Sequence, residues 1–180
     1  VDVGVVRAKR DGSTETQYFI NSFSYGLGGE VAKSIQRNES MLSPTATYFI
    51  ASAVGFLKCK PFTLDIELPN QDKVTKECMN LFAMNGRFSG GGMSWAPNAS
   101  LDDGLLDFVL VEKMSKFKLA TVAPKVYDGS FVNVPGVSYQ QVSKIKIRAK
   151  EDLWVEMDGE VMQAQELELS VLSRAIEFIC

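Results

Sequence analysis

The segment 85–107 combines residue types that could bind a phosphate or a cation. Gly90, Gly91 and Gly92 let backbone amides approach a ligand closely, and Asp102-Asp103-Gly104 supplies carboxylates and turn carbonyls, the oxygen ligands that Mg²⁺ prefers. A Gly-rich hairpin loop with Asp-Gly turns would have the same composition. From composition alone, both interpretations stay open.

A second acidic group follows at Glu156-Met157-Asp158-Gly159-Glu160. In an extended chain, residues two apart point to the same side, so Asp158 and Glu160 could converge, and Glu156 could join them if the strand runs on through the glycine. Paired carboxylates suit proton abstraction or metal binding. Asp-Gly is also a common hairpin turn, so a solvated turn is the alternative.

The segment 21–32 is expected to run from a strand through glycines into a helix. A helix N-terminus after glycines can bind a phosphate, but the P-loop spacing and lysine are missing, so close packing of strand on helix is equally compatible. Aromatic residues near this segment are expected in the core, with a lipid pocket as the alternative. They are Phe19, Phe23, Tyr48, Phe49 and Phe56.

Residue patterns predict the elements that position these segments. Strands are expected over 1–10 and 15–25 around an Asp11-Gly12 turn, over 62–68 and 73–84, over 105–111, and over the stretches 145–149, 153–157, 165–172 and 175–179. Helices are expected from Gly28, from Ser43-Pro44 to about Leu57, and from Ser115 to about Tyr127, where Pro124 would bend or end the helix. Many short strands with inserted helices favour a mostly β fold, an antiparallel β-sandwich in one domain.

Composition narrows the function classes. The net charge of −3 is spread over interleaved charges, so nucleic acid is not an expected partner. The sequence has no histidine, so any catalysis must rest on carboxylates. Three widely spaced cysteines fit a reducing cytoplasm, and the longest apolar run is about half of the ~20 residues that span a bilayer.

Taken in order, three segments resemble the C-terminal domain of the bacterial diacylglycerol kinase and lipid kinase family, whose superfamily includes sphingosine, ceramide and NAD kinases. The most specific is N-G-R-F-S-G-G-G-M-S-W-A-P-N-A-S-L-D-D-G-L-L-D, supported by N-S-F-S-Y-G-L-G-G-E-V-A and M-D-G-E. The resemblance implies that residues 1–180 form the C-terminal β-sandwich of a two-domain kinase. Its N-terminal ATP-binding domain would carry a Gly-Gly-Asp-Gly-Thr motif, which is absent here.

The resemblance also implies roles for individual residues. Asp158 matches the proposed base for the lipid hydroxyl, and Glu160 a partner in a Mg²⁺ and water network. Asp103, with backbone carbonyls near Ser100 and Leu105, matches a structural Mg²⁺ site. ATP would be the phosphate donor, bound mainly by the other domain.

The expected activity is phosphorylation of a lipid, most simply diacylglycerol giving phosphatidic acid, by a cytoplasmic protein peripheral to the membrane. A sphingoid base, ceramide or phosphatidylglycerol fits the same motifs. A non-catalytic lipid-binding or regulatory domain and a divergent NAD kinase are the alternatives. Residues 1–180 alone are expected to be inactive, and a homodimer is possible.

Overall fold

The chain forms a mostly β domain in which every strand pair of the described residues is antiparallel. The computed structural model describes residues 1–10, 13–26, 55 and 60–178. A nine-stranded sheet has the order β2-β1-β11-β10-β3-β5-β8-β9, and β4 pairs with both β10 and β5. The strands are β1 (Val3–Arg10), β2 (Ser13–Phe19), β3 (Ser22–Gly26), β4 (Phe62–Glu67), β5 (Val74–Met84), β8 (Leu106–Glu112), β9 (Val137–Val142), β10 (Lys144–Met157) and β11 (Glu160–Leu172).

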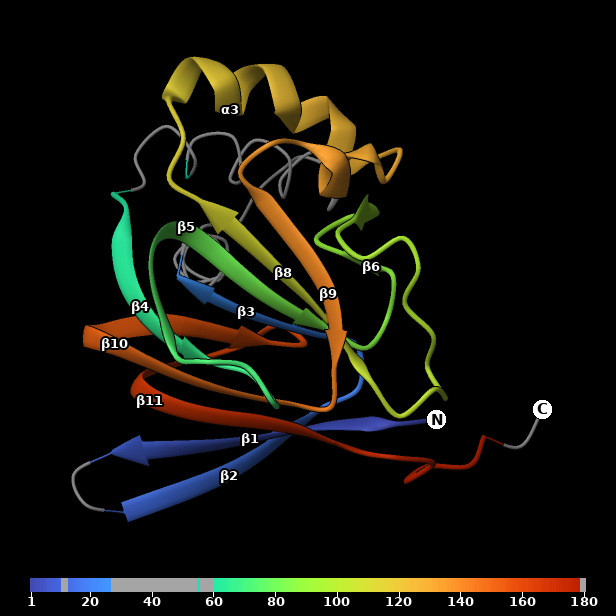
Figure 1. The fold of residues 1–180 in the computed structure, drawn as a ribbon. Coiled ribbons are helices and arrows are strands. Elements are labelled where there is room, and N and C mark those ends of the chain that lie inside the picture. The colour runs from blue at the N-terminus through green and yellow to red at the C-terminus, as the bar shows by residue number, and fades with distance from the viewer. Residues whose placement is uncertain (11–12, 27–54, 56–59, 179–180) are drawn as a thin grey trace, which may run out of the picture.

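The sheet folds over to make two layers. Figure 1 shows β1, β2, β10 and β11 in one layer, with β3, β5, β8 and β9 crossing over them. Two short strands join the layers, because β3 and β4 both lie between β10 and β5 and each pairs with one part of their length. The pairing of β10 with β11 shifts register between Arg148 and Leu153. The predicted antiparallel sandwich is therefore confirmed.

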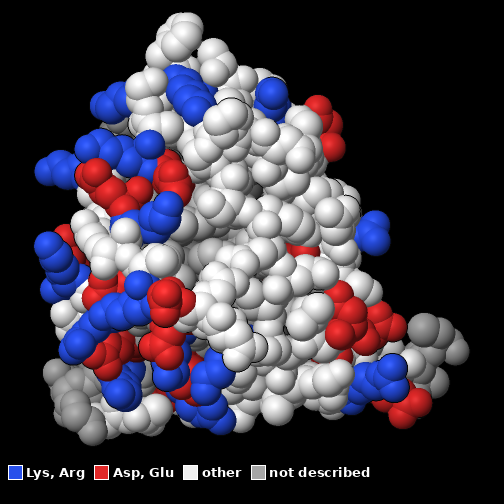
Figure 2. Space-filling view, viewed as in Figure 1, with Lys and Arg blue, Asp and Glu red and all other residues white. Residues whose placement is uncertain are grey.

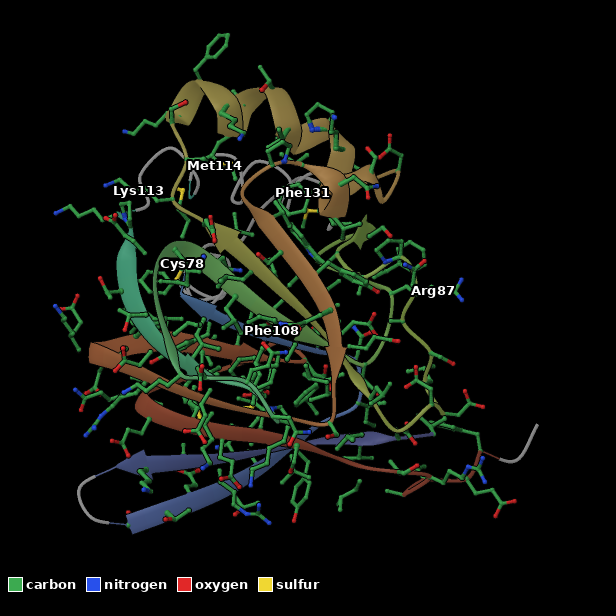
Figure 3. The ribbon with its side chains drawn as sticks, viewed as in Figure 1. Cys78, Arg87, Phe108, Lys113, Met114 and Phe131 are labelled. Atoms are coloured by element: carbon green, nitrogen blue, oxygen red, sulfur yellow. The ribbon has the colours of Figure 1, made fainter. Side chains whose placement is uncertain are left out.

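Alternating side chains fill the space between the layers. On β10, Ile145, Ile147 and Ala149 are buried while the Lys and Arg residues between them are exposed, as the sequence pattern predicts. Phe108 points into this interior in Figure 3. Burying side chains of this size contributes about 1.5–3 kcal/mol each, so this core holds the sheet ends that carry the acidic segments.

A second core lies on the other face of β5 and β8. Ser115 caps α3 (Lys116–Val122) by accepting from the Lys118 amide, and the chain continues as 3₁₀ turns over Ala123–Val126 and Ser130–Asn133. Pro124 thus ends the α-helix, as predicted. Trp95 stacks on Phe82, with ring centroids 4.3 Å apart, and meets Phe131 edge-on. Phe131 lies below α3 in Figure 3. This core fixes the segment after the three glycines to the sheet.

Several predicted element boundaries were wrong. The stretch 15–25 is two strands, because β2 ends at Phe19 and β3 begins at Ser22 in another part of the sheet. The stretches 145–149 and 153–157 form one strand, β10, whereas residues 175–178 are not a strand, and β9 was not predicted. The Asp11-Gly12 turn and the helices predicted between 28 and 57 fall outside the described residues, except Gly55.

Candidate functional site

All three acidic or glycine-rich segments meet where β2 passes into β3. Asp158 Oδ2 accepts a hydrogen bond from the Ile20 amide at 2.6 Å, and its Oδ1 accepts from the Ser22 amide at 2.7 Å. The intervening Asn21 amide donates to both oxygens, at 3.1 and 3.3 Å. These three amides lie at a break between strands, so the carboxylate supplies acceptors that a strand partner would otherwise provide.

Asp158 and Gly159 form the two-residue turn between β10 and β11. Their φ angles are 48° and 96°, and Met157 pairs with Glu160 across the turn. Turns of this kind need positive φ at both central positions, which Asp and Gly tolerate best. The strand therefore does not run on through the glycine. The same-face argument for the convergence of Asp158 and Glu160 was wrong, and Glu160 is exposed at the start of β11.

Glu156, the third carboxylate of this segment, lies near the end of β10, two residues before the turn. Its Oε1 accepts a hydrogen bond from the Gly159 amide at 2.7 Å. Burial raises the pKa of Glu156 to about 7; the Gly159 hydrogen bond opposes this shift and the nearby charge of Asp158 adds to it. A carboxyl with this pKa changes charge near neutral pH.

The glycine-rich segment packs against the same strand break. Asn21 Nδ2 donates to the Phe88 carbonyl at 3.0 Å, and the Asn21 carbonyl accepts from the Asn85 and Gly86 amides at 2.9 and 3.0 Å. A Cβ on Gly86 would lie 2.2 Å from Asn21 Oδ1, so a side chain at this position would displace that contact. Ser22 Oγ lies 3.3 Å from Ser89 Oγ. The contacts join the segments 21–32 and 85–107 directly.

The three consecutive glycines turn the chain between two short strands, β6 (Phe88–Ser89) and β7 (Met93–Ser94). Gly90, Gly91 and Gly92 have φ of 59°, 84° and 95°, a conformation that other residues rarely adopt. The hairpin interpretation of this loop is therefore correct as geometry.

Asn85 links this break to the start of the chain. Its side chain is buried, and Nδ2 donates to the Ile20 carbonyl at 2.7 Å and to the Asp2 carbonyl at 2.9 Å. Asp2 is itself buried and accepts from the Gly104 and Arg174 amides, each at 2.6 Å. Asn85 thus connects the Asp158 turn to the Asp-Asp-Gly loop.

The Asp-Asp-Gly loop lies at the same end of the sheet. Asp103 Oδ1 accepts from the Leu105 amide at 2.9 Å, and its Oδ2 accepts from Gln141 Nε2 at 3.1 Å. Gln141 pairs with Asp107, which pairs with Met84, which pairs with Ser22, so one row of residues crosses β9, β8, β5 and β3. The two acidic segments therefore occupy one end of the same sheet.

Mg²⁺ in proteins is usually held by one or two carboxylates and keeps several of its waters. The Asp103 carboxylate with nearby turn carbonyls is a ligand set of this kind. In the described part of the chain no cluster of three or more Cys, Asp or Glu side chains could hold a metal. Asp103 with the carbonyls of Ser100 and Leu105, the ligand set that the resemblance implies, stays a prediction. Ser100 Oγ donates to Asp102 at 2.8 Å, which turns that carboxylate toward the loop itself.

Two buried carboxylates of this end were not identified from the sequence. Asp107 is buried within a strand whose other residues are mostly apolar, and it accepts a hydrogen bond from the Tyr139 hydroxyl. Burial raises the pKa of Asp107, although its hydrogen bonds from Tyr139 and Gln141 oppose the shift. A single acid inside an apolar strand is the sequence signal that could have indicated the buried Asp107. Asp2, at the chain start, has no comparable signal.

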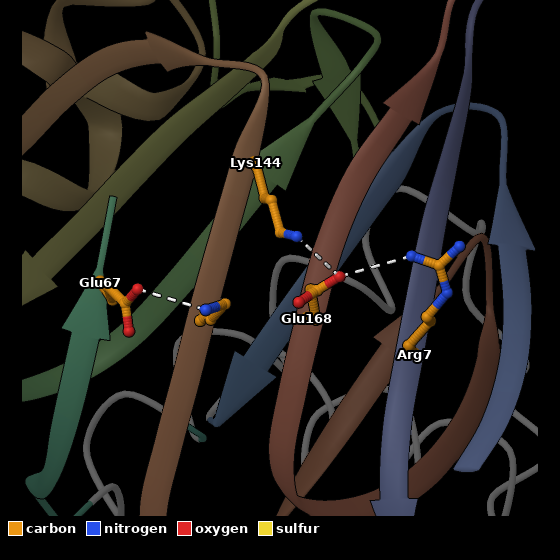
Figure 4. A network of polar contacts seen from close by, with 5 residues as sticks. Arg7, Glu67, Lys144 and Glu168 are labelled. Atoms are coloured by element: carbon orange, nitrogen blue, oxygen red, sulfur yellow. Dashed lines mark hydrogen bonds and ion pairs between the residues drawn. The ribbon is translucent and has the colours of Figure 1, made fainter. Parts of the chain in front are cut away.

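A different surface carries most of the clustered charge. Figure 2 shows Lys and Arg mixed with Asp and Glu along one side, while the centre of the view is nearly free of charge. Glu168 contacts Lys144 at 2.9 Å and Arg7 at 3.4 Å, and Lys146 contacts Glu67 at 3.2 Å (Figure 4). These pairs cross neighbouring strands and stabilise the sheet by little each, so we assign this face no site.

Comparisons with known proteins give a consistent result. Residues 21–180 match the model of the YegS C-terminal NAD kinase beta sandwich-like domain. The Bacillus subtilis protein named diacylglycerol kinase is 25% identical over 158 residues, covering 87% of this chain and 52% of that protein. A Shewanella frigidimarina protein named "Probable lipid kinase YegS-like" is 26% identical over 181 residues, covering 98% of this chain and 55% of that protein.

A solved structure shows the same fold. A crystal structure titled as a diacylglycerol kinase from Bacillus anthracis aligns with a TM-score of 0.56 at 18% identity, covering 96% of this chain and 51% of that one. The chain spans about half the length of the curated relatives it matches. Within the described residues, no helix has the length and apolar character needed to cross a membrane.

Proposed function

Because the chain belongs to the YegS C-terminal NAD kinase β-sandwich-like domain family, we propose that its parent protein transfers the γ-phosphate of ATP to a lipid hydroxyl. Diacylglycerol is the proposed acceptor, giving phosphatidic acid. The names of the two curated relatives support this assignment. In this proposal the chain forms the acceptor side of a cleft, and the ATP-binding side carries the Gly-Gly-Asp-Gly-Thr motif that these 180 residues lack.

The observation that carries the proposal is the meeting of three separate segments at Ile20, Asn21 and Ser22. Phosphoryl transfer needs little covalent chemistry from the protein and depends on positioning and on a carboxylate that orients the attacking hydroxyl. Asp158 is exposed and fixed by three amides. A carboxylate has about four acceptor positions, and all four take an amide contact here, the longest being the 3.3 Å branch of the shared Asn21 hydrogen bond. In this proposal the substrate hydroxyl would replace that branch.

Two exposed apolar residues belong to the hydrogen-bond network around this carboxylate. Ile20 and Phe88 are 41% and 55% exposed, and their backbones bind Asp158 and Asn21 respectively. Exposed apolar side chains beside a polar group suit a lipid alcohol, whose hydroxyl would meet Asp158 while its acyl chains contact the rim. Both therefore support a lipid as the acceptor.

Mg²⁺ would lie at the Asp103 loop, held by the Asp103 carboxylate and the Ser100 and Leu105 carbonyls. Bound there, it would neutralise charge and order the loop beside the site. Glu160, exposed next to the Asp158 turn, would join a water network. In this proposal the chain's own residues orient the acceptor, and the donor nucleotide is bound elsewhere.

The test is transfer of radiolabelled phosphate from ATP to a panel of lipids in mixed micelles, using the gene's full-length product. We expect labelling of diacylglycerol. The rate of labelling should fall at least about a hundredfold in Asp158→Asn, since misplacing or removing a catalytic group costs about this much. Asp72→Asn is the matched control, because Asp72 is exposed between β4 and β5. It should keep full activity.

Each alternative predicts a different outcome. Labelling of a sphingoid base, ceramide or phosphatidylglycerol instead would keep the lipid kinase and change its acceptor. Labelling of no lipid, together with saturable NAD binding by calorimetry, would replace it by an NAD kinase. Lipid binding without any phosphorylation would indicate a binding domain. The 180-residue chain by itself should label nothing.

A further inference from the structure

We propose that Glu156 is a positioning residue for Asp158: it holds the Gly159 amide and so fixes the turn that directs the Asp158 carboxylate. This inference rests on the proposed function for its kinetic consequence. The contact itself stands on the structure, in which the Gly159 amide donates to Glu156 Oε1 at 2.7 Å.

The turn has two amides, and each is held by a different group. The Asp158 amide donates to the Ser22 carbonyl at 3.1 Å, and the Gly159 amide donates to Glu156. In a two-residue hairpin turn the second central amide ordinarily faces solvent. The hydrogen bond from the Gly159 amide to Glu156, two residues before the turn, therefore adds a constraint that the hairpin does not require.

The constraint acts on Asp158 because both turn residues have positive φ. A β10–β11 turn that changed conformation would carry the Asp158 carboxylate away from the amides of Ile20 and Ser22. A Cβ at Gly159 would meet no atom within 4 Å, so no neighbouring atom excludes a side chain at this position. The hydrogen bond to Glu156 holds its amide.

The surroundings of Glu156 contain no cation among the described residues. It pairs with Ser24 on β3 and with Val161 on β11, both uncharged, and the charge that acts on it is that of Asp158. Ser24 Oγ accepts from Asn80 Nδ2 at 3.1 Å. With its raised pKa, Glu156 loses its charge as the pH falls through neutrality, and its charge-assisted bond to Gly159 becomes a weaker neutral one.

Two variants separate positioning from general structural damage. Glu156→Gln keeps an oxygen that can accept from Gly159 but cannot titrate, whereas Glu156→Ala removes the acceptor. Glu151→Gln is the control, because Glu151 is an exposed residue of the same strand. The first readout is the ¹⁵N–¹H shift of the Gly159 amide in the 180-residue chain between pH 5.5 and 8.5.

We expect the Gly159 shift to titrate with a midpoint near 7 in the wild type and in Glu151→Gln, and to be flat in Glu156→Gln. The second readout is kcat/KM for lipid phosphorylation by the full-length product. Its acidic limb near pH 7 should vanish in Glu156→Gln, and Glu156→Ala should lose about tenfold to hundredfold at every pH. KM for ATP should stay unchanged.

The outcomes are distinct. A flat Gly159 shift in the wild type, or the same acidic limb in wild type and Glu156→Gln, would overturn the inference while leaving the kinase proposal intact. If the wild type phosphorylates no lipid, the proposed function fails. In that case the Gly159 titration, and its loss in Glu156→Gln, still decides whether Glu156 holds the turn.

Discussion

Glu156 should make the stability of this domain fall as the pH rises. Its pKa goes from 4.5 to about 7 on folding, mainly because burial disfavours the charged form. Between these values the folded state keeps a proton that the unfolded chain has released, so the free energy of unfolding decreases with rising pH. The contribution is fully present below 4.5 and is lost above about 7.

The magnitude follows from the size of the pKa change. At about 1.4 kcal/mol per pH unit, the difference is about 3 kcal/mol in total, and most of it falls between pH 5 and pH 8. The carboxyls of Asp65, Asp128 and Glu168 have lowered pKa values, so their contributions are lost on acidification instead. A wild-type curve alone would mix these effects.

The assay compares urea unfolding of the wild type and Glu156→Gln at several pH values, followed by tryptophan fluorescence. We expect the wild type to lose about 2–3 kcal/mol relative to the variant between pH 5 and pH 8. Because Gln cannot titrate, the difference between the curves isolates Glu156. Parallel curves would refute the assignment of a raised pKa to this residue, and the same difference in Glu151→Gln would refute its attribution to Glu156.

Two further predictions concern the links at this end of the sheet. Asn85→Ala should lower the free energy of unfolding by about 2–4 kcal/mol in urea titrations, because it leaves the Asp2 and Ile20 carbonyls without their amide donor; a loss below 1 kcal/mol would contradict this. Millimolar Mg²⁺ should raise the thermal midpoint of the wild type, and Asp103→Asn should abolish the increase, since binding to the folded state stabilises it. An equal increase in both proteins would place the ion elsewhere.

Local patterns were sufficient for most of the fold. Alternation predicted β4 and the first part of β10, and Ser115 predicted where α3 begins, because each of these signals depends on neighbouring residues. Pro124 ends the helix at Val122, before the predicted end at about Tyr127. The break at Ile20 was missed for the opposite reason. Residues 15–25 contain no Gly or Pro to mark a break, and pairing with distant strands separates β2 from β3.

The sequence predicted which segments form the candidate site, but not how they lie in space. The sequence indicated Asp158 and the Asp103 loop, yet the same-side argument for Glu160 assumed a continuous strand where the chain turns. The contacts that assemble the site span 136 to 138 residues between Asp158 and the amides it holds. No local pattern carries that information, since it depends on which strands become neighbours.

Asp158 also has a structural role, and this role affects how a loss of activity in Asp158→Asn is interpreted. Asn at this position would keep one oxygen but would turn an NH₂ group toward backbone amides, two sets of donors facing each other. Lost activity in Asp158→Asn could then come from a displaced strand break and not from a missing base. The two causes differ in two measurements. A missing base leaves the free energy of unfolding and the amide resonances of Ile20 and Ser22 unchanged. A displaced strand break lowers the free energy of unfolding and shifts both resonances.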